Sequence, residues 1–171
     1  MFKNLSYLWM AIAILLVQIF LLDELSIAMW LRPMIFPLIV LLLPMEWKPI
    51  WALLTALAVG LTMDLLLGGA GLYTATLTPV AMLRRSMLYV TTKRSVEHGD
   101  QTSVLSRLRP QQTMFYIATM VAIHHTLFFV LEALSLATLL HLIATIIFST
   151  LLSTIIAWPI VKIFTLKIIA K

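Results

Sequence analysis

Cysteine is absent from this 171-residue sequence, and charged residues make up only 11% of it. The missing cysteines exclude disulfides, thiolate metal centres and cysteine nucleophiles, and they leave the redox compartment undetermined. With 62% hydrophobic residues and a mean hydropathy of +1.05, the chain is far too apolar for an ordinary soluble domain. The sequence therefore predicts an all-α membrane protein that forms one transmembrane domain over residues 1–171.

Catalytic motifs are missing as well. The chain has no Gly-x-Ser-x-Gly, no His-Glu-x-x-His and no glycine loop that could cradle a phosphate. Membrane proteases and lipid phosphotransferases need several converging polar groups, whereas Asp64 has no second acid close to it in sequence. We therefore expect a non-enzymatic protein with no catalytic, cofactor-binding or metal-binding residues, and the basic balance does not indicate nucleic-acid binding.

Apolar runs predict six membrane spans, at 7–22, 30–43, 50–67, 72–90, 113–134 and 137–164. The first could be mistaken for a signal peptide, but Asp23 and Glu24 fall inside the would-be cleavage region. The second contains Pro33 and Pro37 and is followed by Pro44. Its most apolar part, residues 34–43, is ten residues long and covers roughly half a bilayer core. Either that helix extends back through Trp30–Arg32, or it is a broken segment supported by neighbouring helices. Pro79 predicts a kink in the fourth span.

The basic residues predict the orientation. With six spans and a cytoplasmic N-terminus, only Arg32 of the twelve Lys and Arg residues lies outside, as the positive-inside rule requires. Both termini are then cytoplasmic. The cytoplasmic basic residues near the polar stretch 91–112 are expected at the inner interface of the membrane, where they would attract anionic lipid. They are Arg84, Arg85, Lys93, Arg94, Arg107 and Arg109. That stretch is either a short amphipathic turn or a solvated loop.

A group of small residues surrounds one acid in the third predicted span. Gly60, Asp64 and Gly68 recur at i, i+4 and i+8 and share one helix face, which would let another helix approach closely. The acid is expected to be charged and paired with Arg32, in preference to the alternative pairs of Arg32 with Asp23 or Glu24. A second interpretation is that Asp64 bonds to backbone amides near the turn that ends at Gly71.

Two further polar groups lie within predicted spans. The amide of Gln18 requires a partner from another helix. His124 and His125, with Glu132 on nearly the face of His125 and His141 at the start of the last span, could bind a metal or relay protons. Adjacent histidines point roughly 100° apart on a helix, so buried neutral histidines that bond across helices are the favoured interpretation.

Together these features resemble the MreD family, small polytopic subunits of the bacterial cell-elongation (rod) machinery. The resemblance covers the first four spans best, through Gln18, a proline opening the second span (Pro37), and Gly60-Leu-Thr-Met-Asp64 running on to Gly71. The chain departs from the family pattern at Leu38, where many members carry an acid, and in its longer basic loop. The candidates for structural or partner contacts are Gln18, Arg32, Pro37, Gly60, Asp64, Gly68 and Gly71.

The resemblance implies a scaffold of the bacterial inner membrane that binds MreC, a single-span periplasmic protein. Through MreC it would help couple cytoplasmic MreB filaments to the wall synthase outside, a glycosyltransferase paired with a transpeptidase. The family's fold is similar to the substrate-binding subunits of energy-coupling-factor vitamin transporters. A solute-binding membrane subunit is therefore the alternative function.

Overall fold

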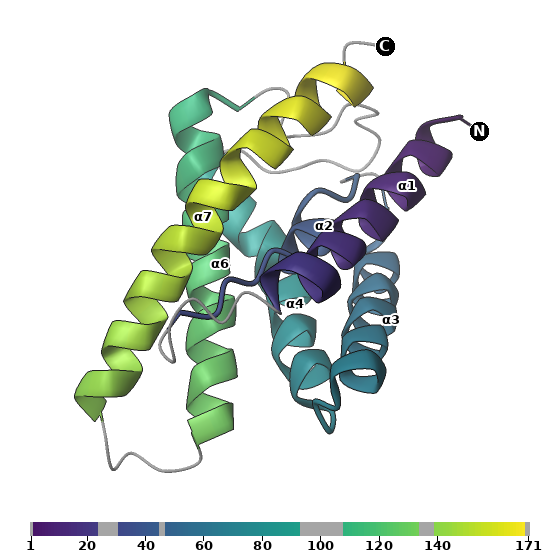
Figure 1. Ribbon diagram of the computed structural model, residues 1–171. Helices are drawn as coiled ribbons and strands as arrows, with labels where there is room; N and C mark the ends of the chain where they lie inside the picture. Colours follow the sequence, from purple (N-terminus) through teal and green to yellow (C-terminus); the bar gives the residue numbers. More distant parts are fainter. Residues whose placement is uncertain (1, 24–30, 45–46, 93–107, 134–138, 170–171) are drawn as a thin grey trace.

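The computed structural model describes residues 2–23, 31–44, 47–92, 108–133 and 139–169 (Figure 1). These residues form helices and no β-strand. The elements in chain order are α1 (Phe2–Val17), the π-helix η1 (Gln18–Leu22), α2 (Pro37–Leu41), α3 (Pro49–Leu67), α4 (Leu72–Thr92), α6 (Pro110–Ala133) and α7 (Leu139–Ile169). The described part of the chain is therefore all-α, as the sequence predicts.

Three of these helices are long and apolar enough to cross a membrane: Pro49–Leu67, Pro110–Ala133 and Leu139–Phe164. Their outer faces carry large exposed hydrophobic side chains, such as Leu65 on α3 and Leu140 on α7, which are 76% and 84% exposed. Lipid tails are as apolar as leucine, so such faces are stable in a bilayer and unfavourable in water. The chain is a helical membrane protein.

The predicted second span is wrong in extent. Only Pro37–Leu41 is helical, and the five residues Leu31–Ile35 before it adopt no regular structure. A proline disfavours the α-conformation of the residue before it, so Pro33 disfavours a helix at Arg32, whereas Pro37 starts a helix at its first position. A five-residue helix is about 7.5 Å long, a quarter of a bilayer core. The chain therefore contains the broken segment rather than the extended helix.

The other predicted spans coincide with helices, and most of their ends agree to within a few residues. Gly68 ends α3 in the left-handed conformation with φ 71°, and Pro79 lies inside α4. The fifth and sixth predicted spans correspond to α6 and α7, with α6 beginning three residues earlier, at Pro110, and α7 reaching Ile169. The predicted amphipathic turn or loop at 91–112 falls mostly on residues 93–107, which lie outside the described residues.

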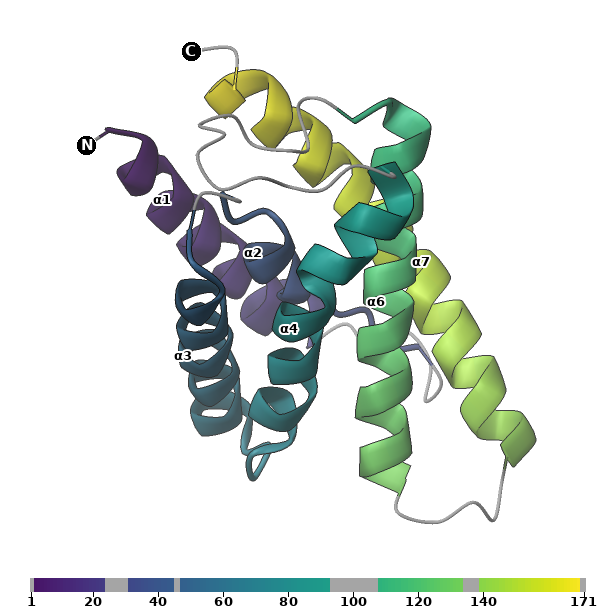
Figure 2. The ribbon, with the colours of Figure 1, turned by 180° about the vertical axis from the view of Figure 1, so that it is seen from behind.

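Two antiparallel helix pairs, α3–α4 and α6–α7, form the body of the bundle, and α4 packs against α6 (Figures 1 and 2). The short α2 lies between them and contacts α1, α3, α4 and α6, so all five of its residues are buried. α1 crosses the front of the bundle and packs against α2 and α7. α1 begins and α7 ends at the same end of the molecule, while the α3–α4 turn lies at the opposite end (Figure 1).

Candidate functional site

Asp64 closes the α3–α4 hairpin. Its Oδ1 accepts a hydrogen bond from the backbone N–H of Tyr73 (3.0 Å), and its Oδ2 accepts from the backbone N–H (2.9 Å) and the hydroxyl (2.6 Å) of Thr74. Tyr73 and Thr74 are the second and third residues of α4, whose N–H groups have no partner within the helix. The carboxylate therefore caps α4 from the neighbouring helix and also compensates the positive end of its dipole.

The glycines around Asp64 make this cap possible. A Cβ on Gly60 would lie 2.6 Å from the Cα and 2.9 Å from the N of Thr74, so the two backbones touch there. Gly69 is also confined, because its Cβ would lie 2.6 Å from Asp64 Oδ1. Gly71 has φ 91°, a conformation that favours glycine, just before α4 begins. The predicted close approach at the Gly60 face is confirmed.

The predicted pair between Asp64 and Arg32 is wrong. Arg32 Nη1 lies 2.5 Å from Glu132 Oε1 at the end of α6, and both side chains are partly exposed. Asp64 instead bonds to backbone amides beside the glycine turn, which is the second interpretation drawn from the sequence. Three donors from one helix end already surround the carboxylate, so its charge is compensated without a guanidinium.

Gln18 holds the extended segment in front of α2. Its Nε2 donates to the carbonyl of Pro33 (3.1 Å), and its Oε1 accepts from the N–H of Ile35 (2.7 Å). Gln18 is buried and opens the π-helix η1. The partner of its amide is therefore the backbone of the broken second segment rather than another helix. Non-helical backbone at membrane depth is stable only when protein groups satisfy it, and Gln18 does so for one donor and one acceptor.

Two serines of α7 accept hydrogen bonds from other backbone N–H groups of that segment. Ser153 Oγ accepts from the N–H of Met34 (2.9 Å), and Ser149 Oγ accepts from the N–H of Arg32 (3.2 Å). Ser153 Oγ also lies 3.2 Å from His125 Nε2, while His125 Nδ1 lies 2.8 Å from the carbonyl of Val121. A carbonyl only accepts, so Nδ1 donates to Val121. His125 thus connects α6 to α7 through Ser153.

Arg84 is buried inside the protein, whereas the predicted attraction of anionic lipid requires an exposed cation. Arg84 is 4% exposed, and its Nη2 donates to the carbonyl of Leu43, just after α2. Arg85 is half-buried and donates to the carbonyl of Trp47 (3.4 Å). The two arginines therefore bind the turn that follows α2. Of the other predicted interfacial cations, Arg109 is exposed, whereas Lys93, Arg94 and Arg107 lie outside the described residues.

The histidines do not gather into a metal centre. His124 is fully buried, with its Nε2 3.4 Å from the hydroxyl of Thr76 and its ring against Phe36. Glu132 is engaged by Arg32 instead of by a histidine. Within the described ranges, no three His, Asp or Glu side chains come close enough to hold a metal ion.

The remaining candidates are structural. Pro37 is buried at the start of α2, and Gly68 lies in open space at the end of α3, where its role is its positive φ. Sequence reasoning missed Ser149, Ser153 and the buried position of Arg84. The two serines are spaced i, i+4 within an apolar helix, and Arg84 continues the buried face of α4 that includes Leu77 and Val80. Both signals are present in the sequence.

The arrangement of the polar side chains is mainly structural. The polar side chains inside the bundle bond mainly to the chain's own backbone. Comparison of the chain with protein-family models, curated proteins and solved structures gives no match.

Proposed function

We propose that this chain is a non-enzymatic scaffold of the bacterial cell-elongation (rod) complex in the cytoplasmic (inner) membrane. In this proposal it binds MreC and helps couple cytoplasmic MreB filaments to the periplasmic glycosyltransferase and transpeptidase that build peptidoglycan. Six spans, cytoplasmic termini and a fold similar to the substrate-binding subunits of energy-coupling-factor transporters are parts of the same proposal. Its basis in the sequence is the resemblance to the MreD family.

The observation that carries the proposal is how the buried polar groups are used. Asp64 caps α4, Gln18 and Ser153 satisfy the segment before α2, and Arg84 binds the carbonyl of Leu43. A catalytic or solute site would need such groups to converge on an open space. Here they stabilise an irregular helical fold whose outer faces are apolar, such as the exposed face of α3 around Leu65. Such a fold is suited to contact the single helix of a membrane partner.

One observation favours the alternative, a solute-binding membrane subunit. The Nδ1 atom of His124 is buried and has no hydrogen-bond partner among the described residues. Such an atom is unfavourable in an apolar interior and would be satisfied by a small polar ligand or an ordered water. The scaffold proposal needs no ligand at this position, so the two functions differ in what the purified protein retains.

Co-purification from membranes distinguishes the two functions. The tagged chain is co-expressed with MreC, extracted in a mild detergent and analysed for both protein and small molecules. A polytopic protein of similar size with the same tag, treated identically, controls for non-specific recovery. Retention of MreC by this chain and not by the control supports the scaffold. Recovery of the chain alone, with a small molecule released on denaturation, supports the solute-binding subunit.

A further inference from the structure

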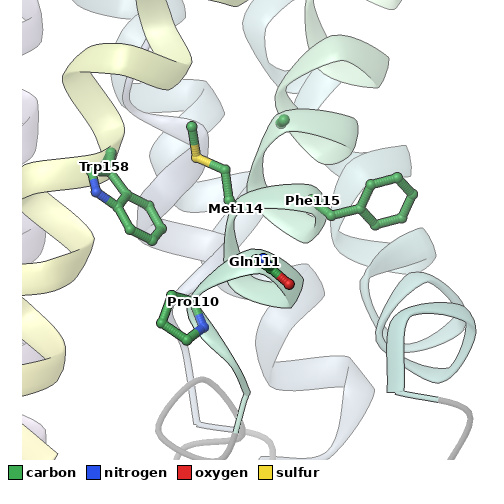
Figure 3. Close-up of a pocket in the computed structure, with 6 residues that line it drawn as sticks. Pro110, Gln111, Met114, Phe115 and Trp158 are labelled. Carbon is green, nitrogen blue, oxygen red and sulfur yellow. The ribbon is translucent and has the colours of Figure 1, made fainter.

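A groove of about 480 Å³ lies between α6 and α7, near the start of α6 (Figure 3). Trp158 of α7 and Met114 of α6 lie across from each other in it, and Pro110 closes its lower part in this view. Gln111 is the one polar residue among those that line it. The volume is within the range of about 300–1,000 Å³ that small-molecule sites occupy. The groove is thus large enough for an apolar chain and is separate from the polar contacts described above.

Two cations adjoin this groove. Arg109 directly precedes Pro110 in the chain, and Lys162 follows Trp158 by four residues, one turn further along the same face of α7. Both side chains are exposed, and neither forms an ion pair with any residue in the described part of the chain. Tryptophan is enriched where a membrane meets water, which is also where lipid headgroups lie. An apolar groove, a tryptophan and two exposed cations therefore occur together.

We propose that this groove binds an anionic phospholipid, with an acyl chain between α6 and α7 and the headgroup phosphate between Arg109 and Lys162. Basic pockets between transmembrane helices are known to hold anionic headgroups. An apolar helix of another protein could cover the apolar wall but would bring no counter-charge for the two cations. The acyl chain of a phospholipid covers the apolar wall, and its phosphate neutralises both cations. The charges therefore favour a lipid as the occupant.

Quenching of tryptophan fluorescence by brominated lipid tests the site on the full chain in nanodiscs. The probes are phosphatidylglycerol and phosphatidylethanolamine with the same brominated acyl chains. The chain has five tryptophans, so the difference between the wild type and Trp158→Phe isolates the signal of the groove. We expect Trp158 to be quenched at a lower mole fraction of phosphatidylglycerol than of phosphatidylethanolamine. Arg109→Gln and Lys162→Gln should each reduce that preference about fivefold, the effect of one interfacial cation.

Lys48→Gln is the matched control, because it removes one exposed cation just before α3, away from the groove. It should leave the preference at Trp158 unchanged. Unaltered quenching of the other tryptophans in every variant shows that the fold is intact. The proposal is overturned if Trp158 shows no preference for the anionic lipid, or if Lys48→Gln lowers the preference as much as the two groove variants. It is also overturned if neither lipid quenches Trp158, since the groove is then covered by protein.

Discussion

Gly60→Ala should destabilise this protein, although alanine is normally the better helix residue. In an open helix position the change would stabilise by about 0.5–1 kcal/mol. At Gly60, however, the new Cβ would lie 2.6 Å from the Cα of Thr74, about 1 Å inside the optimal carbon–carbon separation of roughly 3.5–4.0 Å. The obstacle is backbone, so no rotamer change relieves it, and α3 and α4 must separate.

The size of the effect follows from two costs. Overpacking in a tight interior costs about 1–3 kcal/mol. Separation of the helices also lengthens the bonds from Thr74 to Asp64, and hydrogen bonds to a charged group contribute about 1.5–3 kcal/mol each. After the gain in helix propensity, we expect a net loss of about 1–3 kcal/mol for Gly60→Ala and a larger loss for Gly60→Leu.

Unfolding in mild detergent by titration with sodium dodecyl sulfate, followed by circular dichroism, measures this loss. Ala58→Leu is the matched control, because Ala58 is an exposed position on the same helix. It should change the stability by no more than a few tenths of a kcal/mol. The double variant Gly60→Ala/Asp64→Asn should lose less stability than the two single variants lose in total, because both changes weaken the same contact. Equal or higher stability of Gly60→Ala would refute the close approach of α3 and α4.

Three further predictions concern the other polar contacts. Gln18→Leu leaves the N–H of Ile35 unpaired, so that amide should exchange hydrogen faster, with a loss of about 1–3 kcal/mol in the same unfolding assay; unchanged exchange would contradict the role of Gln18. The reversed pair Arg32→Glu with Glu132→Arg should restore the stability that either single change removes, up to about 1 kcal/mol for an exposed pair, and failure to restore it would argue against this ion pair. Arg84→Met should destabilise by about 1–3 kcal/mol in the same titration, because the Leu43 carbonyl loses its donor, whereas wild-type stability would show that Arg84 is dispensable there.

Much of the fold could be predicted from the sequence because the membrane constrains it strongly. Long apolar runs and the prolines and glycines between them locate α3, α4, α6 and α7 to within a few residues at most ends. The segment before α2 could not be assigned, because a buried extended backbone depends on partners from distant helices. Gln18 and Ser153 supply those partners from positions 17 and 119 residues away from the amides they bind.

The residues of the site could be predicted from the sequence, but their hydrogen-bond and ion-pair partners could not. The spacing of Gly60 and Asp64 correctly indicated a close helix contact at that face. The prediction of Arg32 as the partner of Asp64 was wrong, because it rested only on their opposite charges and similar predicted depth. Four residues after Asp64 the chain turns at Gly68, and this turn brings the N-terminus of α4 back to the carboxylate. A helix end supplies positive potential without a charged side chain, which a search for ionic partners overlooks.

The most direct test of the proposed scaffold function is reconstitution of the purified chain with purified MreC in the same nanodiscs. We expect one species that contains both proteins, detected by native mass spectrometry. Gly60→Leu should reduce the yield of this complex, because it unfolds the α3–α4 hairpin. The control Ala58→Leu leaves the hairpin folded and should not reduce the yield in this way. If the two proteins remain separate while the folded chain alone retains a small polar molecule, the scaffold function is contradicted and the solute-binding function takes its place.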